Sequence, residues 1–390
     1  MDRIRKSVPS RPFPVRVPVQ FPRLALPLLL AAALTACDLT PGRAGTVAFG
    51  LAAPLTRPYG ENSRLGAELA AEELNAAGEL DGVTIAIRAR DDGGEGAAAI
   101  QVASRFVDDP QVVAVVGHAN SDPMMAASRV YHDGELPAVG TSATSTEIAE
   151  AGPWIFRIAS NDSANAAAIA REARRFGLRV GILYANDEYG NSLAAIFRKA
   201  LAQTDAVLVG TDPYLEEMKD FRPYLLRFKA RQAEVLLVAG LEVGASTMIR
   251  QMREVGLSAR VLGGDGLESL TSMEGNYDGT MFGMLYHPET SDRARAFAAT
   301  FRRRYNREPE SAAATSYDAV YLLARALKSG ARSRAEIREY LEGVGRPGGS
   351  EPFVGVTGPV AFDENGDPVG KPVAIAAIEG TRFRLVHSGR

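Results

Sequence analysis

The strongest constraint on the fold is an alternation of short apolar segments with longer segments of helical spacing, repeated in two runs along the 390-residue chain. Short apolar runs bounded by Gly or polar turns are typical of buried strands, and the segments between them show the period of amphipathic helices. This alternation predicts parallel, doubly wound sheets, and two runs predict two α/β lobes with a cleft between them. The predicted strands cover residues 46–51, 84–90, 112–116 and 138–139 in the first run, and 179–185, 206–214, 235–239, 260–263 and 280–285 in the second.

A hydroxyl-rich loop follows the predicted strand that ends at Val139. Gly140 breaks the strand, and five of the six residues from Thr141 to Thr146 carry hydroxyl groups. In an open parallel sheet, ligands bind just beyond the carboxyl ends of the strands. Backbone N–H groups and hydroxyls at such a place suit a small anion, for example a carboxylate. The alternative is an ordinary turn from strand to helix, because Ser and Thr are common N-caps.

Near the C-terminus the sequence predicts a β-hairpin. Predicted strands at residues 360–362 and 373–379 flank the turn 363–367, which reads Asp-Glu-Asn-Gly-Asp. Asn-Gly is a favoured hairpin turn. A calcium-binding loop fits less well, because the turn lacks the length and the closing Glu of such loops.

The N-terminal segment differs from the rest of the chain. Six basic residues and one acidic residue precede an apolar run at residues 24–36. This run is too short to span a bilayer comfortably, but it suits the apolar part of a signal peptide. It ends in Leu34-Thr-Ala-Cys37, which is similar to the bacterial lipoprotein box, and Cys37 is the only cysteine. We therefore expect residues 1–36 to be a signal peptide and Cys37 to be acylated; a free buried cysteine is the alternative.

Charge and hydropathy restrict the partners of the mature chain. Without residues 1–36 it would hold 38 basic and 46 acidic residues, a formal charge near −8. No basic cluster remains that would favour nucleic acid. The sequence has no second apolar run of spanning length, so we expect contact with the membrane only through a lipid anchor.

The sequence lacks the common motifs of covalent and metal chemistry. It contains no Gly-x-Ser-x-Gly, no His-Glu-x-x-His and no complete P-loop. The stretch 366–371 is one residue short of a P-loop and follows a predicted turn instead of a strand. The four histidines have no spacing typical of metal ligands. We therefore expect a protein that is not an enzyme and that uses no cofactor and no metal.

Nine short motifs occur in order along the mature chain. They are 53–60 (Ala-Pro-Leu-Thr-Arg-Pro-Tyr-Gly), 64–71 (Arg-Leu-Gly-Ala-Glu-Leu-Ala-Ala), 75–78 (Asn-Ala-Ala-Gly), Asp91-Asp92, 115–118 (Val-Val-Gly-His), 187–190 (Asp-Glu-Tyr-Gly), 263–266 (Gly-Gly-Asp-Gly), 317–320 (Tyr-Asp-Ala-Val) and 362–367. Each is weak alone, but their order and spacing are specific. Together they resemble the type I periplasmic solute-binding proteins of ABC importers, in the branch that binds branched-chain amino acids.

The resemblance implies two α/β lobes that are joined by three crossings and that close on a ligand by a hinge motion. We expect these crossings near residues 157–160, 285–288 and 348–356. The expected organisation is a signal peptide at 1–36, a lipidated tether at 37–45, lobe 1 at 46–158 and 287–352, and lobe 2 at 159–286 and 353–390.

The resemblance also implies which residues contact the ligand. In the family, the α-carboxylate is usually held by the loop after the third strand and by the hydroxyl-rich loop. These positions match Ser121 and the stretch Ala143-Thr144-Ser145. Aromatic residues usually come from the loop after the first strand and from the second lobe, at positions that match Tyr59 and Tyr189.

An acidic residue of the second lobe usually pairs with the α-ammonium group of the ligand, and its position matches Asp265. A desolvated ammonium needs a charged acceptor. The glycines around Asp265 would leave its carboxylate unobstructed and would allow unusual backbone dihedrals. The alternatives are a strand-end cap for Asp265 and a core position for Tyr189.

The chain departs from the family after the predicted strand 235–239. Relatives often place an aromatic residue there, whereas this chain has Leu241-Glu242. Glu242 in the cleft would favour a ligand with a second polar or cationic group; alternatively it points to solvent.

By this resemblance we expect a monomeric, lipid-anchored solute-binding protein outside the cytoplasm. It would deliver an amino acid, or a similar small amphoteric ligand, to the permease subunits of an ABC importer. The alternatives are a ligand-binding sensor subunit of the same fold that acts through a separate signalling partner, and an enzyme built on the doubly wound fold.

Overall fold

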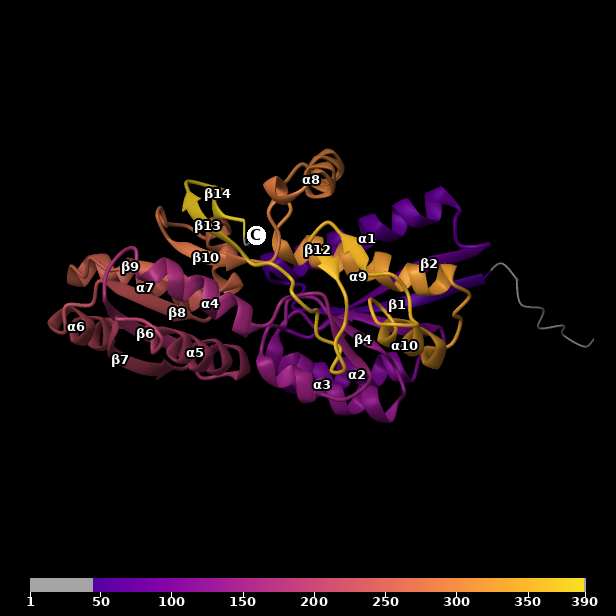
Figure 1. The fold of residues 1–390 in the computed structure, drawn as a ribbon, viewed down its shortest axis with the longest axis horizontal. Coiled ribbons are helices and arrows are strands. Elements are labelled where there is room, and N and C mark those ends of the chain that lie inside the picture. Colours follow the sequence, from indigo (N-terminus) through magenta and orange to yellow (C-terminus); the bar gives the residue numbers. More distant parts are fainter. Residues whose placement is uncertain (1–44, 389–390) are drawn as a thin grey trace, which may run out of the picture. The chain divides into compact units, whose positions relative to one another are not determined.

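The computed structural model describes residues 45–388 of the chain (Figure 1). The predicted signal peptide, Cys37 and residues 37–44 of the predicted tether lie outside the described residues. Two large sheets and one short two-stranded sheet organise the described part. None of its helices is long and apolar enough to cross a membrane.

The first sheet has five parallel strands in the order β2-β1-β3-β4-β5. Because side chains alternate along a strand, Phe49 and Val116 face a core with α1, α9 and α10, whereas Ala48 and Val115 face a second core with α2 and α3. We call this sheet with its helices the first lobe. Its elements are β1 (Gly45–Ala53), α1 (Pro58–Ala77), β2 (Val83–Asp91), α2 (Gly96–Val107), β3 (Val112–Gly117), α3 (Ser121–Asp133), β4 (Ala138–Gly140), the 3-10 helix η1 (Thr146–Glu150), β5 (Ile155–Arg157), α9 (Ser311–Lys328) and α10 (Arg334–Glu342). In addition, α8 (Asp292–Tyr305) packs against α1 and α9.

The second sheet has seven strands in the order β14-β13-β10-β9-β8-β6-β7. The five strands from β6 to β10 are parallel, and β13 and β14 extend the sheet in antiparallel pairing. Helices α6 and α7 cover one face, and α4 and α5 cover the other. We call this part the second lobe. Its elements are α4 (Asp162–Ala173), β6 (Arg179–Ala185), α5 (Glu188–Leu201), β7 (Val207–Tyr214), α6 (Arg222–Ala230), β8 (Val235–Ala239), α7 (Glu242–Val255), β9 (Arg260–Gly263), the 3-10 helix η2 (Asp265–Ser272), β10 (Met281–Met284), β13 (Ala374–Glu379) and β14 (Arg382–His387), with the short 3-10 helix η3 (Pro288–Thr290) after β10.

The predicted hairpin around residues 363–367 is wrong in its strand pairing. β12 (Gly358–Val360) pairs with β11 (Phe353–Gly355), whereas β13 pairs with β10 and β14. The turn itself is closed locally, by a bridge between Phe362 and Pro368 and by backbone hydrogen bonds from Asp363 N–H to Asp367 and from Val369 N–H to Ala361. The two predicted strands separate because Val360 and Phe362 pack in the core of the first lobe, while the apolar residues of β13 pack in the second.

The chain passes between the lobes after β5, after β10 and before β13. The third passage lies later than expected. The sequence placed it at 348–356 and assigned residues 353–390 to the second lobe. Instead, Phe353, Val360 and Phe362 pack with the core of the first lobe, and β12 lies beside α9 in Figure 1.

Candidate ligand-binding site

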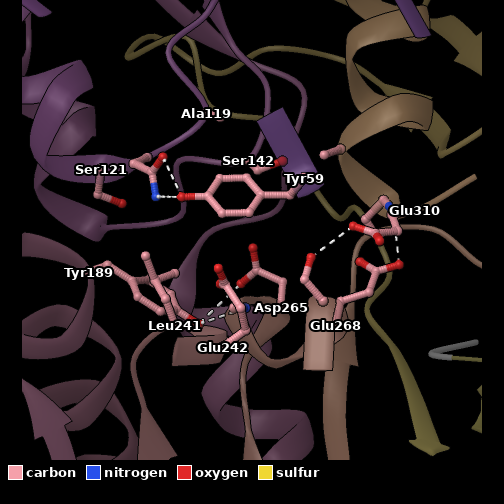
Figure 2. Close-up of a pocket in the computed structure, with 15 residues that line it drawn as sticks. Tyr59, Ala119, Ser121, Ser142, Tyr189, Leu241, Glu242, Asp265, Glu268 and Glu310 are labelled. Carbon is pink, nitrogen blue, oxygen red and sulfur yellow. Dashed lines mark hydrogen bonds between the residues drawn. The ribbon is translucent and has the colours of Figure 1, made fainter. Parts of the chain in front are cut away.

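A cavity lies at the carboxyl ends of the parallel strands and is lined by both lobes (Figure 2). Its lining residues follow the ends of β1, β3, β4, β8 and β9, or stand at the start of α5 and α9. Open parallel sheets bind ligands at this edge, because polar loops there rest on rigid strands. The cavity volume of about 50 Å³ is several times the roughly 10–15 Å³ that one water needs. The site therefore suits a small molecule.

The first lobe contributes hydroxyl and amide groups to this cavity. Tyr59 stands in the first turn of α1, and the Asn120 side-chain amide donates to its hydroxyl at 3.1 Å. Burial raises the pKa of the Tyr59 phenol, so the phenol stays neutral. Ser121 begins α3, and Ser142 comes from the hydroxyl-rich loop. The sequence pointed to Tyr59 and Ser121 but missed Asn120 and Ser142, each of which is a direct neighbour of a predicted residue.

The three hydroxyl-loop residues that the sequence singled out lie behind the cavity instead of lining it. Ala143, Thr144 and Ser145 are fully buried. Ser145 is the N-cap of η1: its hydroxyl accepts the Glu147 N–H at 3.2 Å and donates to Glu188 of the second lobe at 2.6 Å. The capped-turn interpretation therefore holds for Ser145. This turn leaves Ser142 as the hydroxyl that reaches the cavity.

The second lobe contributes the carboxyl group of Asp265, which is half-buried. This residue begins η2 directly after β9, and the Tyr189 hydroxyl donates to its Oδ1 at 3.3 Å. Burial, and secondarily the nearby Asp162, raises the pKa of Asp265 to about 7. Both Tyr189 and Asp265 line the cavity, and their contact with a ligand stays a prediction.

Gly264 allows Tyr189 and Asp265 to approach each other. Its φ of −89° is an ordinary one, so the expectation of unusual dihedrals at this position is wrong. A Cβ atom at Gly264 would lie 2.4 Å from the Tyr189 hydroxyl oxygen and 2.9 Å from Leu193 Cδ2. The glycine is therefore required by close packing and not by backbone conformation.

Glu242 is the first residue of α7, and it lines the cavity instead of pointing to solvent. Its side chain is 2% exposed, and its Oε1 lies 3.5 Å from Nη1 of Arg57 in the first lobe. Burial raises the pKa of Glu242, whereas Arg57 lowers it. The sequence could not separate the two orientations of Glu242, because its exposure depends on how the lobes meet.

A pair of glutamates at one end of the cavity was missed by sequence reasoning. Glu268 of η2 accepts the Ser311 N–H at 2.9 Å, and Glu310, the N-cap residue of α9, accepts the Ser269 hydroxyl at 2.8 Å. Both bonds run between the lobes, and both carboxyl groups are buried. Burial and the neighbouring Glu310 raise the pKa of Glu268, and burial raises the pKa of Glu310. The local sequence gives no signal for this pair, since its members are far apart in the chain.

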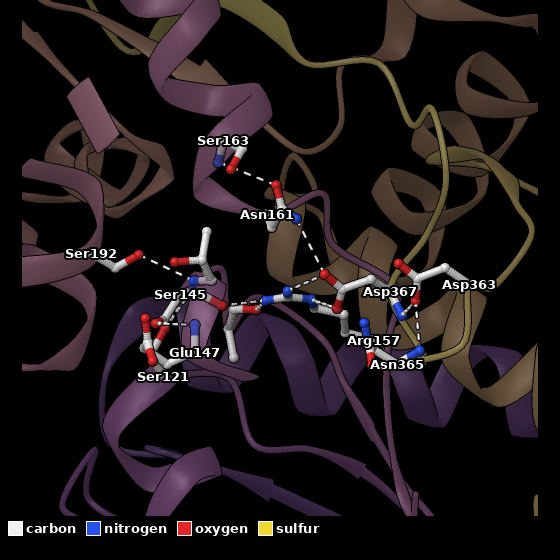
Figure 3. Close-up of polar contacts among 12 residues, drawn as sticks. Ser121, Ser145, Glu147, Arg157, Asn161, Ser163, Ser192, Asp363, Asn365 and Asp367 are labelled. Carbon is white, nitrogen blue, oxygen red and sulfur yellow. Dashed lines mark hydrogen bonds and ion pairs between the residues drawn. The ribbon is translucent and has the colours of Figure 1, made fainter. Parts of the chain in front are cut away.

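Arg157 lies between the hydroxyl-rich loop and Asp367 (Figure 3). It is fully buried at the end of β5 and forms a two-bond ion pair with Asp367. Its Nη1 also donates to the Ser145 carbonyl at 2.6 Å, and the Asn161 side chain donates to Asp367 at 3.1 Å. Arg157 thereby connects the hydroxyl-rich loop, the passage after β5 and the passage before β13.

This arrangement defines a protein that encloses a small molecule between two lobes, with hydroxyl groups on one side and carboxyl groups on the other. Among the described residues, no group of His, Cys, Asp and Glu side chains is arranged to hold a metal ion. The chain belongs to the periplasmic binding protein family, whose pattern it matches over residues 46–382.

Relatives and solved structures agree with this assignment. An amino acid binding protein of Pseudomonas aeruginosa is 30% identical over 333 residues, which cover 82% of this chain and 87% of that protein. Leu/Ile/Val-binding protein homolog 1 of Brucella abortus is 30% identical over 336 residues, which cover 83% of this chain and 87% of that protein. A solved structure with a similar fold is the branched-chain amino acid transporter substrate binding protein LivJ of Streptococcus pneumoniae in complex with isoleucine. Its TM-score is 0.80 and its identity 27%, and the match covers 88% of this chain and 100% of that chain. The predicted family and the two-lobed α/β fold are thus confirmed.

Proposed function

We propose that the protein is an extracytoplasmic solute-binding protein that binds an amino acid, or a similar small amphoteric molecule, and passes it to the permease of an ABC importer. The observation that carries this proposal is the cavity in which first-lobe hydroxyl groups stand opposite the carboxyl group of Asp265 (Figure 2). The names of two relatives, which describe amino-acid binding, support it. In this role the protein is a receptor, not an enzyme, and it releases its ligand unchanged.

In the proposed complex the two charges of the ligand are held by different lobes. The α-carboxylate lies at Ser121 and Ser142, close to the N-terminus of α3, whose dipole favours an anion. Asp265 accepts the α-ammonium group, which supplies the counter-charge that a buried carboxylate requires. Tyr59 and Tyr189 cover the ligand from the two lobes, and the Ser142 hydroxyl lies 3.5 Å from the hydroxyl of Thr315 in α9.

The first test is the substitution Asp265→Asn, which keeps the shape of the side chain and removes its charge. We first identify ligands by thermal shift with the common amino acids, and then measure affinities by calorimetry. Affinity should fall at least about a hundredfold, because losing one partner of a buried charge pair costs roughly 3–5 kcal/mol. Asp108→Asn, at an exposed position at the end of α2, is the matched control and should bind normally. Wild-type affinity in Asp265→Asn would contradict the assignment.

We also infer that the mature chain begins at Cys37 and is tethered by a lipid on that residue, which leaves residues 46–388 to form the two lobes. The motif at Leu34–Cys37 and the single cysteine support this inference. Cys37→Ser should shift the protein from the membrane fraction to the soluble extracytoplasmic fraction, which fractionation and immunoblotting would detect. A Cys37→Ser protein that remains in washed membranes would contradict a lipid anchor at this position.

A further inference from the structure

The cavity has an excess of negative charge that one α-ammonium group does not balance. Asp265, Glu242, Glu268 and Glu310 all line it, and no Lys, Arg or His is among its described lining residues. The guanidinium of Arg57 lies 3.5 Å from the carboxyl group of Glu242. Figure 2 shows Glu268 and Glu310 together at one side, with Asp265 and Glu242 beside them.

The protein partners of Glu268 and Glu310 are neutral. Glu268 accepts a backbone N–H, and Glu310 accepts the hydroxyls of Ser269 at 2.8 Å and Ser272 at 3.5 Å. Neutral donors satisfy hydrogen bonds but supply no counter-charge. Arg307, which attracts Glu310 at longer range, is bonded to Glu61 at 2.9 Å. This end of the cavity is therefore prepared for a cation that the described protein does not provide.

Glu242 gives an independent indication of a ligand. Its Oε2 atom is buried and has no hydrogen-bond partner within residues 45–388, although the side chain is only 2% exposed. The N-terminus of α7 and Arg57 favour the carboxylate form, but neither satisfies this oxygen. A buried acceptor without a donor is costly. A ligand with an additional N–H donor in the cavity would satisfy it.

The charge balance identifies the kind of ligand. Arg57 offsets one of the four carboxyl groups, and repulsion between the neighbouring carboxyl groups of Glu268 and Glu310 favours a proton on one of them. Two negative charges remain. One of these negative charges is that of Asp265, which the α-ammonium group of the ligand neutralises. A ligand with an aliphatic side chain would leave the second negative charge buried without a counter-charge. A positively charged side chain would neutralise it.

We propose that the ligand is an L-amino acid with a cationic side chain, and that Glu268 and Glu310, assisted by Glu242, bind its side-chain charge. This rests on the proposed function, because it requires Asp265 to hold the α-ammonium group. A neighbouring pocket has the same sign of charge. It shares Tyr59 and Tyr189 with the cavity, and its acidic lining residues outnumber its one basic residue, Arg57. Such a surface raises the local concentration of cations beside the cavity.

The test compares ligands of matched length. L-lysine, L-ornithine and L-arginine are titrated calorimetrically into the mature protein, with L-norleucine, L-leucine and L-glutamine as uncharged counterparts. At least one basic amino acid should bind about a hundredfold or more tightly than L-norleucine, which corresponds to roughly 2.7 kcal/mol. Binding of L-leucine or L-glutamine as tight as that of any basic amino acid would overturn this inference and leave the proposed function standing. If no α-amino acid binds, both fail.

Variants test the assigned carboxylates. Glu310→Gln and Glu268→Gln should each weaken binding of the basic amino acid by about tenfold or more, because a charged hydrogen bond becomes a neutral one. L-norleucine should bind as well as before or better. Glu308→Gln, two residues away and exposed in a pair with Arg302, is the control and should bind like the wild type. Thermal melting verifies folding; if one variant is unfolded, Glu242→Gln replaces it. Equal losses for L-lysine and L-norleucine would overturn the assignment.

Discussion

Asp265 shows how a single residue couples protonation to ligand binding. Without a cation nearby, burial and the neighbouring Asp162 raise its pKa from 3.8 to about 7. At pH values between these two pKa values, Asp265 of the folded, ligand-free protein holds a proton that it has lost in the unfolded chain. Asp265 therefore lowers the free energy of unfolding as the pH rises from about 4 to 7. A bound ammonium group reverses this preference, because it favours the carboxylate.

We expect ligand binding to release protons at pH 6 and to release almost none at pH 8. The reason is that Asp265 must lose its proton to accept the ammonium group, so affinity should fall by up to about tenfold per pH unit below 7. Calorimetry in buffers of different ionisation enthalpy measures the proton release directly. Burial also raises the pKa of Glu242, Glu268 and Glu310 in the same cavity. The proton release that belongs to Asp265 is therefore the difference in proton release between the wild type and the Asp265→Asn variant. An identical proton release in both proteins would contradict this account.

At the scale of elements, the site depends on how loops are joined behind it. The hydroxyl-rich loop, the passage after β5 and the passage before β13 meet at Arg157 (Figure 3). Arg157 is fully buried, and the Asp367 side chain is 9% exposed. A buried ion pair contributes little net stability when it is compared with an apolar pair, but removing one partner leaves the other charge without compensation. The pair thus maintains the relative positions of three elements.

We expect Arg157→Met to lower the free energy of unfolding by roughly 3–5 kcal/mol, because it leaves Asp367 buried without its counter-charge. Chemical denaturation followed by circular dichroism would measure this. Arg129→Met is the matched control, since Arg129 pairs with Asp133 on the surface with 80% and 55% exposure; it should change stability by less than about 1 kcal/mol. Similar effects of the two substitutions would contradict a structural role for the Arg157 pair.

At the scale of the whole molecule, few polar bonds hold the lobes together around the cavity. Thr146 N–H donates to Ser192 at 3.1 Å, Ser145 donates to Glu188 at 2.6 Å, and Ser311 N–H donates to Glu268. The same interface brings carboxyl groups of both lobes close to each other, since Glu310 belongs to the first lobe and Glu268 to the second. Their repulsion opposes closure until a cation is bound.

We therefore expect the ligand to shift the protein from open to closed forms. Small-angle scattering should show the radius of gyration decreasing when a ligand found by thermal shift is added at saturation. The melting temperature should rise as well, since ligand at one hundred times its Kd adds about 2.7 kcal/mol. Glu268→Gln should reduce the change in the radius of gyration, because it removes part of the repulsion in the ligand-free protein. An unchanged radius of gyration with saturating ligand would contradict hinge closure.

Local patterns in the sequence determined the secondary structure and the fold class. Strand and helix periods depend on neighbouring residues, so β1, β3, β8 and their helices could be placed without tertiary information. The family motifs then led to Tyr59, Tyr189 and Asp265, because the loops that follow parallel strands always meet at one edge of the sheet.

Tertiary structure alone decided which groups share the cavity. Ser142 reaches it in place of Ala143, Thr144 and Ser145 because η1 turns the loop back, and local propensity does not specify that direction. Glu268 and Glu310 meet because η2 and α9 belong to different lobes that come into contact. The pairing partners of β12 and β13 likewise depended on which core buried their side chains. Each of these outcomes is set by contacts between distant segments, whose energies appear only when the chain has folded.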